Sequence, residues 1–205
     1  MAPRAYRASR GRGPLRQAEI LSSIAVPFFR HSSLLSGRRA IVDLQEHDWA
    51  IILSQDCDLD WDYASRFPRG TTPPKNKELP SVLLCEARLV HDGVRLPQFD
   101  RDIWRRVSQN QDERYHVLDA VPADADQLGQ GFAQLLIDFK RYFTVETGEI
   151  YQRLRLGAAN ASKVLRRSEL ESPYREDLSQ RFATYQSRIA LPANYGRRGT
   201  PPTGS

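Results

Sequence analysis

The sequence predicts an α+β protein: a small, strongly bent antiparallel β-sheet with helices at the C-terminal end and one helix inserted between strands. Two observations favour this class. The apolar runs are short and separated by polar or proline-rich stretches, and the clearest helical pattern comes last. With 40% hydrophobic and 27% charged residues, the composition is typical of a globular protein. We expect a disordered Arg-rich arm at 1–16, one domain at 17–191 and a flexible tail at 192–205.

The strand predictions depend on short apolar runs that end at turn-forming residues. We expect buried strands at 49–53 and 82–85, where the apolar residues are continuous, and further strands at 115–121 and 135–145. Between the first two, residues 62–80 contain four prolines and a glycine. Because proline and glycine interrupt regular structure, this segment is predicted to be a long exposed loop.

The last predicted helix has the strongest pattern. Five apolar side chains at spacings of four, four, three and four form one stripe: Tyr174, Leu178, Phe182, Tyr185 and Ile189. Ser172 and Pro173 supply an N-cap and a first-turn proline for this helix. A preceding helix is predicted over 159–170, and a short helix over 100–110 between strands.

The net charge of +5 is unevenly placed. Residues 1–16 contain no acid and five arginines: Arg4, Arg7, Arg10, Arg12 and Arg16. A basic arm of this kind can bind nucleic-acid phosphates. The helix predicted over 159–170 carries Lys163, Arg166 and Arg167, which offer either a second phosphate contact or an ordinary solvated face. The sequence therefore predicts RNA or DNA as a partner through these residues.

The chain has no apolar run long enough to span a bilayer, and arginines interrupt the first 16 residues, where a signal peptide would have an apolar core. We expect a cytoplasmic protein without membrane contact. Cys57 and Cys85 have no paired spacing, so both are predicted to be buried free thiols. No cofactor motif is present, and we predict no cofactor.

An acidic row follows the strand predicted at 49–53. In an extended chain four carboxylates would share one face: Asp56, Asp58, Asp60 and Asp62. A calcium loop is excluded because its sixth and twelfth positions would be Trp61 and Phe67. The row instead suits a basic protein surface, or it caps the turn and is solvated. We predict no metal site, and we single out Asp58 as a candidate catalytic residue because it directly follows the buried strand.

Candidate catalytic groups are few. Cys57 is a poor thiolate nucleophile, because the flanking carboxylates of Asp56 and Asp58 raise a thiol pKa. Zinc binding by Cys57, Cys85 and His116 has no support in their spacing. His116 is the best candidate for a general base, although a lone histidine on a strand is more often structural. Arg38 and Arg39 are the cations that would act with it on a phosphate.

The run from Asp48 to Ser54, followed by a loop and residues 82–85, resembles the central strands of the MazF/PemK toxins. Residues 143–145 and the helix after them are similar to the end of that fold, so the resemblance spans 17–191. It implies an SH3-like barrel and RNA as a ligand. Where the toxins have a catalytic arginine this chain has Asp48, and Arg88 stands near the position of a catalytic threonine. The resemblance therefore implies the fold without toxin-type catalysis.

A second resemblance joins two segments, from Ser54 to Asp58 and from Pro173 to Gln180, to a group of bacterial proteins of unknown role. Three functions stay open. The leading hypothesis is a PemK-like, nucleic-acid-associated or regulatory module of a toxin–antitoxin or phage-defence system. The alternatives are a protein-interaction subunit that docks through its acidic row, and an active endoribonuclease that uses His116 with Arg38 or Arg39.

Overall fold

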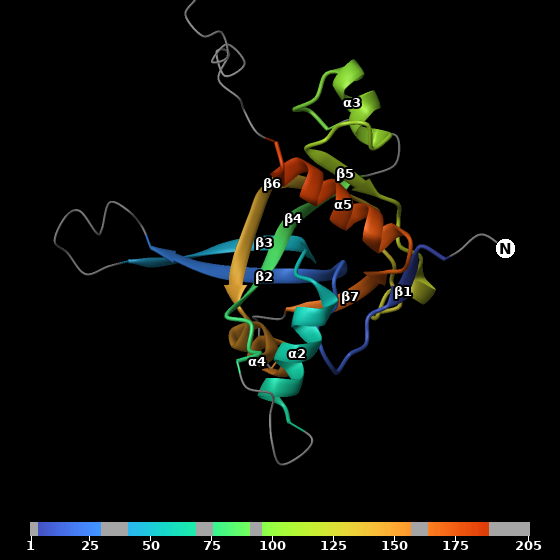
Figure 1. Cartoon of the computed structure of the whole chain (residues 1–205). Helices are drawn as coiled ribbons and strands as arrows, with labels where there is room; N and C mark the ends of the chain where they lie inside the picture. The colour runs from blue at the N-terminus through green and yellow to red at the C-terminus, as the bar shows by residue number, and fades with distance from the viewer. Residues whose placement is uncertain (1–3, 30–40, 69–75, 91–95, 157–163, 189–205) are drawn as a thin grey trace, which may run out of the picture.

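The structure is a computed structural model that describes residues 4–29, 41–68, 76–90, 96–156 and 164–188. Within these ranges seven strands form one antiparallel sheet in the order β1-β7-β2-β3-β4-β6-β5 (Figure 1). The strands are β1 (Tyr6–Ala8), β2 (Glu19–Phe29), β3 (Val42–Ile52), β4 (Ser81–Val90), β5 (Tyr115–Leu118), β6 (Gln134–Glu146) and β7 (Leu165–Leu170). The helices are α2 (Asp56–Arg66), α3 (Arg101–Ser108), α4 (Thr147–Leu156), α5 (Tyr174–Gln186) and the short 3₁₀ helix η1 (Ala123–Ala125). The predicted α+β class is confirmed.

Most of the predicted elements exist, with shifted ends. The strand expected at 49–53 begins earlier, because β3 pairs with β2 as a long hairpin from Val42 onward. The helix expected at 159–170 is wrong for the residues that the structure describes, since 165–170 form β7. Residues 56–66, expected as a strand exit and loop, form α2. The last helix begins at Tyr174 without a side-chain cap, and Ile189 of its stripe lies outside the described residues.

The N-terminal segment corrects another expectation. Residues 4–16 were predicted to be a disordered arm, but Tyr6–Ala8 pair with β7 at the end of the sheet. Farther along, Leu15 is fully buried under α4, where its N–H donates to the hydroxyl of Tyr151. The tail predicted at 192–205 lies outside the described residues. None of the helices in the described ranges is long and apolar enough to cross a membrane.

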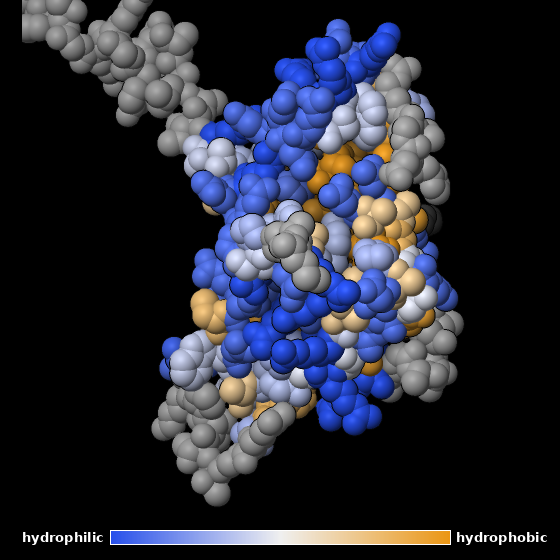
Figure 2. Space-filling view, turned by 90° about the vertical axis from the view of Figure 1, so that its right-hand side faces the viewer, coloured by the Kyte–Doolittle hydropathy of each residue, from blue (hydrophilic) through white to orange (hydrophobic). Residues whose placement is uncertain are grey.

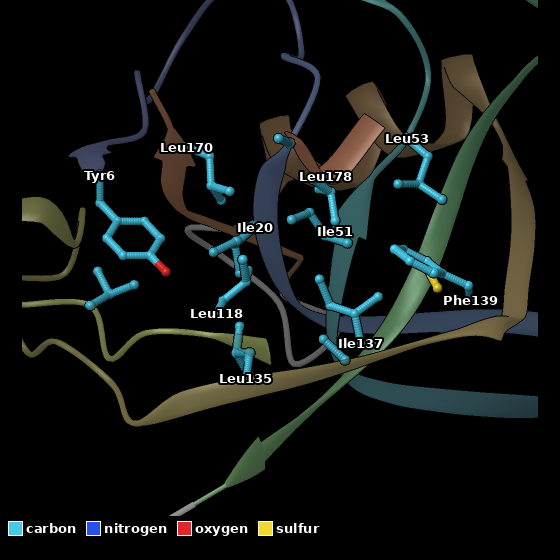
Figure 3. Close-up of a cluster of buried hydrophobic side chains, with 14 of the residues drawn as sticks. Tyr6, Ile20, Ile51, Leu53, Leu118, Leu135, Ile137, Phe139, Leu170 and Leu178 are labelled. Atoms are coloured by element: carbon cyan, nitrogen blue, oxygen red, sulfur yellow. The ribbon is translucent and has the colours of Figure 1, made fainter. Parts of the chain in front are cut away.

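The inner face of the bent sheet packs around one apolar cluster beneath α5. Figure 3 shows Ile20, Ile51 and Ile137 converging from different strands, with Leu178 of α5 above them. Phe139 is fully buried in this cluster, and the centroid of its ring lies 5.6 Å from that of the Phe182 ring. The stripe predicted from the spacing of the last helix is therefore the surface that covers this face.

Two separate groups of helices cover the outer face. At one end, α2 and α4 bury Leu59 and Ile150 against the sheet. At the β5 end, α3 buries Val107 beside Val117 and Leu136. The stretch of β4 and β6 between these two clusters carries charged side chains and is lined by open clefts. This uncovered stretch of the outer face is therefore accessible to a ligand.

The hairpin of β2 and β3 projects from the body of the molecule (Figure 1). Its exposed side chains include Phe28, Val42 and Leu44. Along its β2 edge the carbonyl of Ala25 accepts a hydrogen bond from Arg153.

The two end strands, β1 and β5, do not pair with each other, so the sheet stays open and is not a closed SH3-like barrel. One side-chain hydrogen bond bridges the seam between them. The hydroxyl of Tyr6 donates to the carbonyl of Asp119, just after β5, at 2.9 Å. Figure 3 shows the Tyr6 ring lying across this gap toward Leu118. The edges are thus close in space while their backbones remain unpaired.

Buried ion pairs attach β7 to its surroundings. Arg166 is paired with Glu19 of β2, with Nη2 and Oε2 2.8 Å apart, and also donates to the carbonyls of Gly13 and Pro14. Arg167 forms two hydrogen bonds to Asp126, at 2.7 and 2.8 Å. All four of these paired side chains are at most 8% exposed. Charges this deeply buried are tolerated only when they are paired and hydrogen-bonded.

Replacing Arg166 with methionine tests this arrangement. The variant leaves the carboxylate of Glu19 buried and unpaired, so we expect the free energy of unfolding to fall by about 3–5 kcal/mol. Arg12→Met removes an exposed arginine of the same segment and should change it by less than about 0.5 kcal/mol. Urea unfolding of both variants measures the difference. Equal effects of the two substitutions would contradict a structural role for the pair.

Candidate functional site

The arginines predicted to bind nucleic acid mostly contact acids of this chain. Arg4 pairs with Asp124 at 3.2 Å, Arg7 with Glu169, and Arg16 with Asp60 at 2.9 Å. Arg10 and Arg12 are exposed. Arg166 and Arg167 are buried in the pairs described above, which corrects the expectation that they form a solvent-facing phosphate contact. Lys163, Arg38 and Arg39 lie outside the described residues.

The acidic row does not form one face of an extended chain, because its residues lie on α2. Asp56 accepts a hydrogen bond from Arg175 at 2.9 Å, which joins the two segments of the second resemblance. Asp62 is fully buried and accepts hydrogen bonds from Arg66 and from the Leu79 N–H. Asp58, predicted as the key residue of the row, is exposed in the first helical turn. The paired carboxylates stabilise the fold and do not present a common acidic surface.

His116 lies on β5 and is 4% exposed. Its neighbour Tyr115 lines an open cleft on the outer face of the sheet. Because side chains alternate along a strand, His116 points to the inner face. There the centroid of its ring lies 6.3 Å from that of the Phe139 ring. Burial, with a smaller contribution from the charge of Arg181, lowers the pKa of His116 to about 4. A base of this strength is far weaker than an ordinary histidine near pH 7.

The expected pair of buried thiols is half correct: Cys85 is buried, whereas Cys57 is exposed on α2. Burial raises the pKa of the Cys85 thiol well above its usual range, so this group is inert. Across the described ranges, no group of three or more His, Cys, Asp and Glu side chains is arranged to hold a metal ion.

The uncovered stretch of the outer face brings together a different set of residues, which we call the outer-face cleft: His47, Glu86, Arg88, Arg114, Asp138 and Arg141. They come from β3, β4 and β6 and from the residue before β5. Asp48 also lines this region beside Arg88. The two positions that the toxin resemblance singled out therefore lie in one cleft.

A large irregularity in the pairing of β4 with β6 shapes the cleft. Cys85 pairs with Tyr142 and Ala87 with Ile137. The segment 137–142 of β6 therefore has three more residues than the segment 85–87 of β4 that lies opposite it. The residue between them on β4 is Glu86. Because the extra residues of a bulge break the regular alternation of side chains, both Asp138 and Arg141 can face the cleft. Bulges that redirect side chains in this way occur frequently beside active sites.

Glu86 is the centre of the cleft. Its carboxylate accepts hydrogen bonds from Arg88 Nε at 2.9 Å and from Arg141 Nε at 2.7 Å, one on each oxygen. Burial raises the pKa of Glu86, but these two hydrogen bonds outweigh it, so the pKa lies below its ordinary value. Arg88 and Arg141 are 51% and 46% exposed. The carboxylate is therefore charged near neutral pH and aligns two guanidinium groups that still face solvent.

His47 lies beside this carboxylate. Its Nδ1 is 3.6 Å from Glu86 Oε2, and its ring stacks on Phe143 with centroids 4.0 Å apart. Burial lowers the pKa of His47, with an opposing contribution from Glu86. The stacked ring holds the imidazole in one orientation, and the nearby carboxylate favours the tautomer with its proton on Nδ1. Nε2 then keeps its lone pair and can accept a proton.

At the β5 end of the cleft, Arg114 and Asp138 form a bidentate salt bridge, in which both N–O distances are 2.7 Å. A carboxylate that accepts two parallel hydrogen bonds fixes the guanidinium plane. This pair lies beside Glu86, Arg88 and Arg141 along the same lining. The cleft is thus a rigid row of arginines held by carboxylates.

Sequence reasoning did not single out Glu86, Arg141 or His47 as a group. Glu86 is a charged residue directly after the apolar run at 82–85, which is a weak signal for a special position. The register shift that places Arg141 opposite it has no local sequence signature. Comparison with known protein families, with curated proteins and with solved structures finds no match to this chain.

The buried state of His116 predicts a pH effect on stability. Its folded pKa of about 4 is below the value of 6.5 expected in the unfolded chain, so below pH 6.5 the unfolded state binds the extra proton. Stability should fall from pH 7 to pH 5, with about 2 kcal/mol of the loss due to this residue. Urea unfolding at both pH values should show that His116→Gln lacks this part of the loss. An unchanged pH dependence in the variant would exclude a neutral, buried His116.

Proposed function

We propose that this protein is a PemK-like module that binds nucleic acid in its outer-face cleft. The observation that carries the proposal is the pair of half-exposed guanidinium groups, Arg88 and Arg141, aligned on the single carboxylate of Glu86. Arginine is well suited to phosphate, because its planar fork presents two parallel donors. In both residues the described hydrogen bonds use only Nε, which leaves the terminal nitrogens to point toward a ligand.

The location supports this proposal. The cleft lies between the helices that cover the two ends of the outer face, so an extended strand can enter without displacing a packed element. Arg114 continues the row of cations toward β5. A nucleic-acid backbone presents phosphates at regular intervals, and a row of fixed arginines matches such a ligand. The toxin–antitoxin or phage-defence setting that the resemblance implies remains part of this proposal.

Binding of a labelled single-stranded RNA, followed by fluorescence anisotropy, tests the proposal. We expect Arg88→Met and Arg141→Met each to weaken binding by about 10-fold and to reduce the dependence on salt, because each removes one phosphate contact. Arg12→Met is the matched control: it removes an exposed arginine outside the cleft and should leave the affinity unchanged. Absence of binding at about 50 mM salt would reject the proposal, as would an equal loss in the control.

We further propose that the cleft can cleave RNA, through a different group from the one expected. His47 and Glu86 lie close enough to act as a proton-accepting pair, whereas His116 lies on the opposite face of the sheet. In this reaction Nε2 of His47 takes the proton of a ribose 2′-hydroxyl, and the 2′-oxygen bonds to phosphorus. The bond from phosphorus to the 5′-oxygen breaks, and the leaving oxygen takes a proton from water. The arginines stabilise the charge that develops on the phosphate.

Incubation of a long RNA with the protein tests this second function. We expect His47→Gln to slow cleavage by about 10²–10⁴-fold, the usual contribution of a general base. His116→Gln is the control histidine and should retain the wild-type rate. A DNA of the same sequence has no 2′-hydroxyl and should stay intact. If the rate in His47→Gln equals that of the wild type, or the wild type does not cleave RNA, the cleavage proposal fails and the binding proposal stands on its own measurement.

A further inference from the structure

Arg114 is held in the outer-face cleft in a different way from Arg88 and Arg141. Its Nε and Nη2 both donate to the carboxylate of Asp138, at 2.7 Å each. Its guanidinium carbon lies over the face of the Tyr115 ring, 4.8 Å from the ring centroid. The bidentate pair fixes the plane of the guanidinium group, and the ring covers one of its two faces. One edge and one face of this group are therefore occupied within the protein.

The other face of the Arg114 guanidinium group is accessible to a ligand. The side chain is 37% exposed and lines the end of the cleft near β5. Because Asp138 and Tyr115 occupy Nε, Nη2 and one face, the guanidinium surface that remains is the opposite face together with Nη1. A guanidinium plane stacks well on flat rings. Arg114 and Tyr115 thus form two layers of a stack, which we call the Arg114–Tyr115 stack, and a third planar group can lie on it.

The lower layer of this stack is held in place by the apolar cluster of α3. The ring of Tyr115 packs edge-on against Phe99, with centroids 5.0 Å apart and an interplanar angle of 89°. Phe99 is 5% exposed and belongs to the cluster that also contains Val107. Figure 2 shows that the α3 lobe is hydrophilic at its surface, with hydrophobic residues below it, where it joins the body. Since both layers are already ordered, a ligand that stacks there loses less free energy to the ordering of side chains.

The charges at this end of the cleft favour a neutral ring over an anion. The charged side chains of the lining are Arg88, Arg114, Arg141, Glu86 and Asp138. The carboxylate of Asp112 adds a third negative charge, because it accepts a hydrogen bond from the Arg114 N–H at 3.0 Å. Three guanidinium groups thus face three carboxylates. Arg114 is itself paired with Asp138, whereas Arg88 and Arg141 share the single carboxylate of Glu86, so the excess of positive charge lies beside these two.

The size of this part of the cleft suits one ring system. Its volume is about 250 Å³, and Leu136 contributes an apolar wall beside Tyr115. Sites for drug-sized ligands are larger, roughly 300–1,000 Å³. A single flat ring system against an apolar wall, next to a pair of arginines suited to phosphate, matches one nucleotide of a single strand, with its base at the stack and its phosphate at Arg88 and Arg141.

We propose that the Arg114–Tyr115 stack is a base-binding subsite of the outer-face cleft and that it takes a purine of single-stranded RNA. This inference rests on the proposed function and adds a sequence preference to it. The purine lies on the free face of the Arg114 guanidinium group, and the phosphates beside it contact Arg88 and Arg141. A purine is preferred because its two fused rings cover more of the guanidinium plane than the single ring of a pyrimidine.

Fluorescence anisotropy with labelled RNAs of equal length tests the proposal. One RNA contains only uridine, and a second has one adenosine at its centre. We expect the second to bind at least about 5-fold more tightly, which is the lower end of the contribution of one stacked base. A central cytidine, which is also a pyrimidine, should give no gain. Equal affinities for the uridine and adenosine RNAs overturn the subsite and leave nucleic-acid binding in place, whereas absence of binding by all three at about 50 mM salt rejects both.

Arg114→Lys separates stacking from charge. Lysine keeps the positive charge beside Asp138 but has no planar group. We expect the variant to lose the preference for the adenosine RNA and to bind the all-uridine RNA within about 2-fold of the wild type, because the phosphate contacts remain. Arg88→Met is the matched comparison, since it removes a cation outside the stack and should weaken both RNAs by the same factor of about 10. Retention of the preference in Arg114→Lys, or its loss in Arg88→Met, overturns the assignment.

The Nε–H proton of Arg114 reports on the stack without any substitution, since its hydrogen bond to Asp138 slows exchange with water. The ring current of a purine over the guanidinium plane should move this NMR signal upfield as the adenosine RNA saturates the protein. The all-uridine RNA should move it less. If Arg114 only holds Asp138 in place, the signal does not respond to the purine, and that result overturns the proposal.

Discussion

The buried ion pairs of β7 are the constraint on which the rest of this structure depends. An unpaired charge in the interior costs several kcal/mol, so each charged side chain of this strand requires a partner. Glu19 of β2 pairs with Arg166, Asp126 with Arg167, and Arg7 of β1 with Glu169. These partners come from segments far apart in the chain. For β7 to join the sheet, the N-terminal segment and the loop around Asp126 must therefore be in place at the same time.

This requirement also determines which surface is available for a ligand. Arg166 and Arg167 of β7 stabilise the fold by pairing with acids, as do Arg4, Arg7 and Arg16 of the N-terminal segment. Arg88 and Arg141 of the outer-face cleft are instead half exposed and aligned on one carboxylate. The cleft exists because α2 and α4 cover one end of the outer face and α3 covers the other. The register shift opposite Glu86 then turns Arg141 into the uncovered stretch. Position and chemistry of the site thus follow from packing and from one local irregularity.

The local spacing of apolar residues predicted correctly those helices and strands that contact the core through one regular face. The stripe of α5 and the apolar runs of β3 and β4 are examples, because hydrophobic burial imposes the periodicity of the element on the sequence. It failed at β7, whose buried side chains include charged residues, and at α2, where helix formation brings Asp56 to Arg175. The identities of the partners lie elsewhere in the chain, so no local window contains them.

By itself, the sequence determined the α+β class, the buried parts of β3 and β4 and the final helix, because these depend on the amount and spacing of apolar side chains. Only the tertiary structure decided that Arg4, Arg7 and Arg16 pair with acids of this chain. It also decided that His116 is buried, and that His47, Arg88 and Arg141 lie around Glu86. The physical reason is that charge pairing acts between side chains brought together by folding. Distance along the chain carries little information about such contacts.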